Sequence, residues 1–161
     1  MDHDEDSSGS THKLIHAHAA LCASAVLAFW PIGVMLLRYW KEPSMAVRIH
    51  QWVQVAGFTV YVAGFVLGVI LWTRLKTDLG SSPTLHGVLG VVITGLACVQ
   101  LLLGWWHHKL WQRESAKRGN ARWVKAPERT WVAWMHMSFG WFVILIGIAN
   151  GGIGEQGSFL C

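Results

Sequence analysis

The sequence predicts an all-α integral membrane protein, an up-down bundle of four helices. Of its 161 residues, 53% are hydrophobic and only 14% are charged, whereas a soluble domain would have about a quarter of its residues charged. Four apolar runs stand out, at 14–37, 49–73, 84–106 and 131–153. Each reaches the ~20 residues that an α-helix needs to cross a hydrocarbon core of ~30 Å.

These runs also predict the domain organisation. Residues 1–13 form a polar, acidic N-terminal tail, residues 14–153 form the transmembrane core, and residues 154–161 form a short C-terminal tail. The four runs occupy most of the chain, so we expect no separate soluble domain within it.

The basic residues predict the orientation. Helices that cross in turn place the loops 38–48 and 107–130 on one side, and these loops hold all the Lys and Arg residues except Lys13, Arg74 and Lys76. Basic loops stay in the cytoplasm, so we expect these two loops to be cytoplasmic and both termini to be non-cytoplasmic. The run 107–130 fits a solvated loop near acidic lipid head groups better than a nucleic-acid site. Membrane lipid is therefore an expected partner, and nucleic acid is not.

Each apolar run carries a histidine near its starting end: His18, His50, His86 and His136. No Asp, Glu, Lys or Arg lies inside the runs, and ionisable groups at membrane depth are costly and usually functional. Alternating topology places His18 and His86 near the outer face and His50 and His136 near the inner face. The four therefore form two pairs on opposite sides of the membrane.

Two pairs of neutral imidazoles suit the axial coordination of two haem irons. We predict that His18 and His86 hold an outer haem b and that His50 and His136 hold an inner one. Both are bound non-covalently, because the chain lacks the C-x-x-C-H motif of covalent attachment. With both axial positions filled, the iron serves electron transfer across the membrane rather than ligand activation, and no catalytic residue is predicted. The other histidines are expected to be exposed or interfacial: His3, His12, His16, His107 and His108.

The residues that share a face with these histidines are mostly small or polar. A spacing near 3.5 residues, typical of left-handed bundles, puts glycines on the histidine faces of the last three helices. These glycines fit either close helix packing or clearance for a flat macrocycle. Gln54, Gln100 and Asn150 lie on the same faces. They can bond each other, a second histidine nitrogen or a porphyrin edge, and the sequence leaves this open.

Two rival functions remain. A metal-ion permease would use the histidines as transient ligands, but it would also need carboxylates or thiolates along its path, and the helices offer only Cys22 and Cys98. A haem-free scaffold packed through its glycines would leave the pairing of the histidines by depth unexplained.

The four histidine segments together resemble the cytochrome b561 superfamily, the eukaryotic transmembrane b561 and ferric reductase-like proteins, and in particular the branch that joins this core to a DOMON domain. The matching segments run from about residue 14 to 153. They are His18 followed by Trp30-Pro31-Ile32-Gly33, then Ile49-His50-Gln51-Trp52, His86-Gly87-Val88-Leu89-Gly90 with Gln100, and His136-Met137-Ser138-Phe139-Gly140 with Asn150.

The resemblance implies two b haems with the same histidine pairing. It also implies that ascorbate or a DOMON-type redox domain donates electrons, and that an acceptor such as monodehydroascorbate or ferric iron receives them. It covers only the central four of the six helices typical of this superfamily. The sequence leaves open whether the chain is an ascorbate-dependent or ferric-reductase oxidoreductase and whether it forms a homodimer. It also leaves open the true donor and acceptor, the direction of electron flow and the host membrane.

Overall fold

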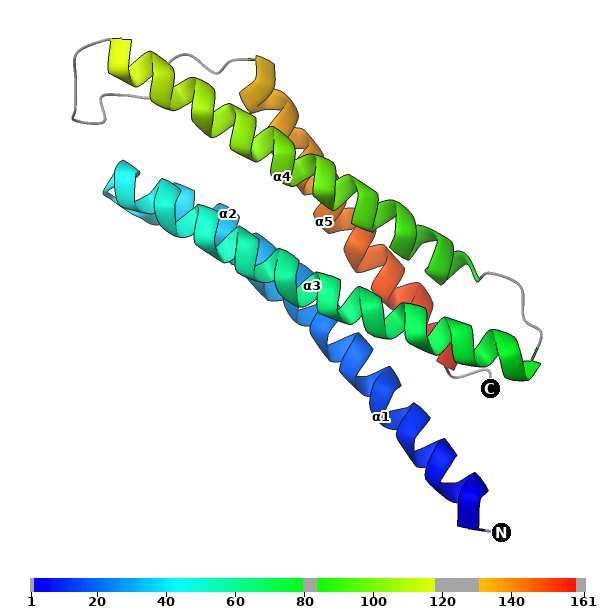
Figure 1. Ribbon diagram of the computed structural model, residues 1–161. Coiled ribbons are helices and arrows are strands. Elements are labelled where there is room, and N and C mark those ends of the chain that lie inside the picture. Colours follow the sequence, from blue (N-terminus) through cyan, green and yellow to red (C-terminus); the bar gives the residue numbers. More distant parts are fainter. Residues whose placement is uncertain (1, 80–83, 118–130, 159–161) are drawn as a thin grey trace.

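The computed structural model describes residues 2–79, 84–117 and 131–158, which are almost entirely helical and contain no strand. The helices are α1 (Asp2–Ser24), the π-helical segment η1 (Ala25–Phe29), α2 (Trp30–Tyr39), α3 (Pro43–Leu79), α4 (Leu85–Lys117) and α5 (Trp131–Ser158). Helices α1, η1 and α2 follow one another without a break. The chain therefore forms four long rods that run up and down in turn (Figure 1).

The first rod changes its winding at its middle. The backbone N–H of Trp30 donates to the carbonyl of Ala25, five residues earlier, and Pro31 then has no N–H to give to the carbonyl of Leu27. A π-turn beside a proline is a common cause of a kink in a helix. Figure 1 shows α1 diverging from the line of α2 and α3 beyond this point.

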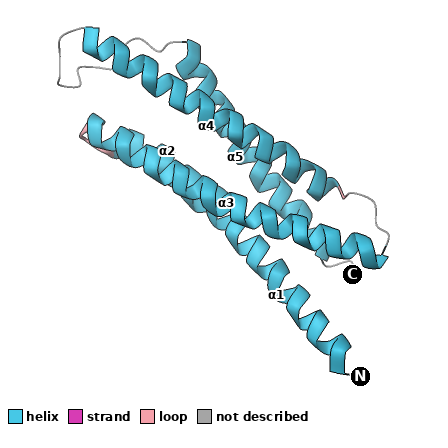
Figure 2. Cartoon of the chain, in the orientation of Figure 1, coloured by secondary structure: helices cyan, strands magenta, loops and turns pink. Residues whose placement is uncertain are grey.

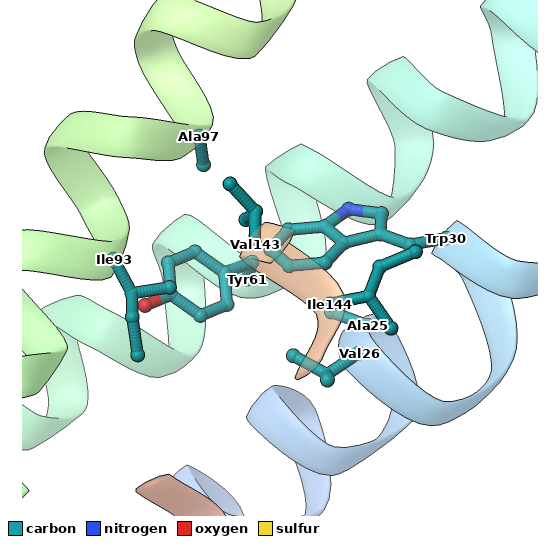
Figure 3. Packing of buried hydrophobic residues seen from close by; sticks show 8 residues of the cluster. All are labelled: Ala25, Val26, Trp30, Tyr61, Ile93, Ala97, Val143 and Ile144. Carbon is teal, nitrogen blue, oxygen red and sulfur yellow. The ribbon is translucent and has the colours of Figure 1, made fainter. Parts of the chain in front are cut away.

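The rods associate as two antiparallel hairpins. Helix α3 packs along α1 and α2, and α4 packs along α5 (Figures 1 and 2). One buried cluster joins the hairpins, with residues from all four rods: Ala25, Val26, Trp30, Tyr61, Ile93, Ala97, Val143 and Ile144 (Figure 3). At its centre, the rings of Trp30 and Tyr61 lie 5.2 Å apart. The core therefore sits midway along the bundle, and the histidines lie toward its two ends.

The outer surface of the bundle is apolar. Large hydrophobic side chains on every rod are at least 60% exposed, including Leu27, Trp52, Leu102 and Leu145. Four segments are long and apolar enough to cross a membrane: Gly9–Tyr39, Met45–Arg74, Leu85–Arg113 and Trp131–Gly154. Only 17–22% of each span's most apolar window is buried inside the protein. Lipid is the solvent that such surfaces need, so the predicted all-α fold with four spans is confirmed.

The helices are longer than the apolar runs from which they were predicted. The first begins at Asp2, within the expected N-terminal tail, and α4 continues to Lys117, within the expected loop 107–130. Helix α5 ends at Ser158, inside the expected C-terminal tail. Hydropathy marks the part of a helix that suits lipid, whereas hydrogen bonding carries the helix on into polar sequence. Residues 118–130 of the basic loop lie outside the described residues.

Candidate functional site

His18 and His86 face each other at the end of the bundle that holds the N-terminus, which we call the two-histidine end. His18 comes from α1 and His86 from α4, and both side chains are half-buried. Their ring centroids lie 5.9 Å apart and their planes are nearly perpendicular, at 89°. The structure thus brings together the two residues that the sequence pairs by depth.

Hydrogen bonds to backbone carbonyl oxygens of the other two rods orient these rings. Nδ1 of His18 donates to the carbonyl oxygen of Gly64 on α3 (2.8 Å), and Nδ1 of His86 donates to that of Asn150 on α5 (3.0 Å). A carbonyl can only accept, so each Nδ1 carries the hydrogen and Nε2 of the neutral ring keeps its lone pair. Histidines that bind metals are held in this way.

Four histidines gather at the opposite end, which we call the four-histidine end: His50, His107, His108 and His136. His50 comes from α3 and His136 from α5, as the alternating topology requires, and α4 adds the other two. The ring centroids of His50 and His108 are 6.1 Å apart, those of His108 and His136 are 6.5 Å apart, and those of His107 and His136 are 6.0 Å apart. The site therefore holds twice as many imidazoles as the two-histidine end.

The expectation that His107 and His108 are merely exposed or interfacial misses this cluster. Both are half-buried, whereas His12 and His16 are exposed as expected. The side chain of His3 lies outside the described residues. The sequence contained a signal for this cluster. His107 and His108 follow Gly104 by three and four residues, and residues at this spacing share one face of a helix.

The hydrogen bonds at the four-histidine end are of two kinds. Nδ1 of His50, a buried residue, donates to the carbonyl of Gly33 on α2 (2.7 Å), so its Nε2 keeps the lone pair. His136 differs. The Gln100 side-chain nitrogen on α4 donates both to Nδ1 of His136 (3.0 Å) and to the His136 carbonyl (2.8 Å). Because Nδ1 accepts here, the neutral His136 ring carries its hydrogen on Nε2.

Glycines make room for three of the rings. A Cβ added to Gly68, Gly154 or Gly104 would lie only 2.8, 2.8 and 2.9 Å from Cε1 of His18, His86 and His136, respectively. Each glycine comes four residues after the hydrogen-bond partner of the same ring, which is Gly64, Asn150 or Gln100. One helix face thus offers a hydrogen-bond acceptor or donor and, one turn on, a gap for the ring. The sequence left open whether these glycines serve helix packing or clearance for a macrocycle. In the structure, they leave space for the imidazole rings.

Each end also has one buried amide oxygen without a hydrogen-bond partner in the described part of the chain: Asn150 Oδ1 at the two-histidine end and Gln100 Oε1 at the four-histidine end. Of the three polar residues whose partners the sequence left open, only Gln100 bonds a histidine nitrogen through its side chain. Gln54 instead donates to the carbonyl of Trp30. Buried acceptors without partners are uncommon in folded proteins.

The ring spacing at the two-histidine end fits a group held between two imidazoles. Within the described ranges, no group of three or more His, Cys, Asp or Glu side chains is arranged to hold a metal ion. A porphyrin supplies four ligands itself and needs only two from the protein. Imidazole–metal bonds of about 2 Å on opposite sides of one iron place two ring centroids roughly 6 Å apart. The 5.9 Å between His18 and His86 matches this spacing.

Comparison with known proteins finds a distant relative. The chain is 28% identical over 149 residues to a cytochrome b561 and DOMON domain-containing protein of Arabidopsis thaliana. The match covers 90% of this chain but 34% of the relative, so the chain spans about a third of that protein's length. No family model and no solved structure matches the chain. The chain is therefore a four-span helical protein with distant similarity to a cytochrome b561 protein.

Proposed function

We propose that the protein transfers electrons across a membrane through two haem b groups, one at each end of the bundle. The close approach of the His18 and His86 rings, each with Nδ1 bonded to a backbone carbonyl, carries this proposal. The distant cytochrome b561 relative supports it. The alternation of the spans supports a second site, built around His50 and His136, at the opposite end.

Bound haem supplies an iron that changes between the ferric and ferrous states. The protein supplies everything else that the transfer needs. His18 with His86, and His50 with His136, would each hold one haem, and a haem held by two imidazoles would have no open position for oxygen or substrate. The buried cluster around Trp30 and Tyr61 fills the space between the two ends with apolar side chains, and this excludes water from the path.

The donor and acceptor sites would lie at the two membrane surfaces. Exposed basic side chains are more numerous near the four-histidine end, where the described ones are Arg38, Lys41, Arg48, Lys109 and Arg113. Near the other end, the described exposed ones are Lys13 and Arg74. This asymmetry supports a cytoplasmic four-histidine end and an anionic reductant such as ascorbate there. A DOMON-type redox domain is a further candidate partner, and monodehydroascorbate or ferric iron are candidate acceptors.

Reconstituted vesicles test this proposal. Ferricyanide is sealed inside vesicles that carry the purified protein, and ascorbate is added outside. We expect the trapped ferricyanide to be reduced much faster than in vesicles without protein. The variants His86→Ala and His50→Ala, each lacking a ligand at one end, should both abolish this gain, because electrons must pass both ends. A rate equal to that of empty vesicles contradicts the proposal. Transport of metal ions by a colourless protein would indicate the permease instead.

A further inference from the structure

We propose that His108 is an alternative axial ligand at the four-histidine end, which exchanges with His136 opposite His50. This inference rests on the proposed function, because it concerns how that end holds its haem. It assigns a binding role to a residue outside the four paired histidines. The two-histidine end has no such spare ligand among the described residues.

The ring geometry singles out His108. Its ring lies 6.1 Å from that of His50 at an interplanar angle of 64°, much like the 5.9 Å and 89° of His18 and His86. No ring contact of this kind links His50 directly with His136 in the described structure. His107 is a weaker candidate, because its ring is nearly parallel to that of His136 (21°) and has no such contact with His50.

The hydrogen bonds explain why His136 is the residue that exchanges. His50 is fixed by its bond to the Gly33 carbonyl and offers the lone pair on Nε2. His136 receives a hydrogen bond at Nδ1 from Gln100, so its own Nε2 is protonated. It can ligate only when its hydrogen moves to Nδ1 and the Gln100 amide turns its unpartnered Oε1 toward that atom. The turn gives up the bond from Gln100 to the His136 carbonyl.

His108 has no such obstacle. No hydrogen bond from the described residues fixes either of its ring nitrogens, so the ring can present the one that the iron needs. Gly104 and His108 are one turn apart on α4, which puts His108 on the face that packs against α5. Exchange of one neutral imidazole for another changes neither the charge nor the number of protons and electrons at the site. The Gln100 amide then selects between two states, one with His136 as ligand and one with His108.

Four variants of the full chain, purified with haem, test this exchange. They are His136→Asn, His108→Asn, the double variant of both, and His86→Asn as the matched control at the other end. Asparagine keeps an oxygen that can accept from Gln100 but does not replace imidazole on iron. The measurements are haem per chain and the ferric low-spin signals in electron paramagnetic resonance. In the three variants at the four-histidine end, the haem at the two-histidine end reports independently that the chain is folded, and in His86→Asn the haem at the four-histidine end does so.

We expect His136→Asn to keep two haems per chain, the double variant to keep one, and His86→Asn to keep one. One haem in His136→Asn, with His108 intact, overturns the exchange while leaving the proposed function standing. A wild-type protein without haem overturns the proposed function itself. If His136→Asn misfolds and loses both haems, the spectrum of His108→Asn tests the exchange instead. This spectrum should lack one low-spin signal of the wild type, and a spectrum identical to the wild type contradicts the proposal.

Discussion

The two ends of the bundle follow one plan and then depart from it. At each end, each paired histidine is oriented by a hydrogen bond with another rod. Two rods contribute histidines at the two-histidine end, and three contribute them at the four-histidine end. At the two-histidine end both orienting groups are backbone carbonyls, those of Gly64 and Asn150. At the four-histidine end one is a carbonyl and the other is the side chain of Gln100. The backbone therefore fixes the rings at the two-histidine end, whereas a rotatable side-chain amide orients His136 at the four-histidine end.

The largest expected effect is the loss of haem at one end of the bundle without loss at the other. His86→Ala or His18→Ala removes one of the two paired imidazoles at the two-histidine end, so we expect loss of one whole haem per chain and retention of the other. Haem per chain, measured on the purified protein, checks this. His16→Ala is the control, since His16 is exposed and close in sequence. Loss of both haems or of neither would refute the separation of the sites.

The contrast between side-chain and backbone partners gives the next effect. Gln100→Leu removes the side chain that donates to Nδ1 of His136. Removal of such orienting partners weakens metal binding by roughly 10–100-fold, and we expect about tenfold for the haem of the four-histidine end. Asn150→Leu leaves the backbone carbonyl that accepts from His86, so its effect should be much smaller. Titration with haem measures both, and equal losses would contradict the contrast.

A crowded glycine gives a smaller effect at the other end. In Gly154→Ala the new Cβ would lie 2.8 Å from Cε1 of His86, so the ring or the helix must shift. Overpacking of this kind costs about 1–3 kcal/mol. Since His86 sits near the end of the bundle and can move, we expect the lower part of this range, or roughly fivefold weaker haem binding at this end.

Gly152→Ala is the matched control, because a Cβ there meets nothing within 4 Å. It should bind haem like the wild type. Equal behaviour of the two variants would show that the gap beside His86 has no part in the site.

The smallest expected effect lies midway between the ends. Tyr61→Phe removes the hydroxyl that donates to the Gly90 carbonyl and accepts from Thr94. Such a bond contributes about 1 kcal/mol, so the variant should unfold at a slightly lower temperature in detergent. Neither haem spectrum should change, since the hydroxyl contacts no histidine. A spectral change at either end would tie this residue to the sites.

The sequence predicts the four spans and the sorting of the histidines because both follow from lipid solvation and alternation. Hydropathy and the position of one histidine near the start of each span suffice for that. It does not predict the π-turn at Ala25–Phe29. It also leaves the hydrogen bonds of Gln100 and Asn150 open, because one bonds through its side chain and the other through its backbone.

His107 and His108 show a different limit. They follow the last apolar residues of α4, where hydropathy cannot tell a helix that continues from a loop. The structure carries α4 on to Lys117, and the continued helix turns His108 toward α5. The ligand roles of all these histidines stay predictions, which haem-binding experiments test.

The most direct test is the visible spectrum of the purified wild-type protein, expressed with ample haem and recorded in the oxidised and reduced states. The account predicts two haems per chain, each low-spin with two imidazole ligands. A protein that stays folded but colourless contradicts the central claim that paired histidines at each end of this bundle hold haem.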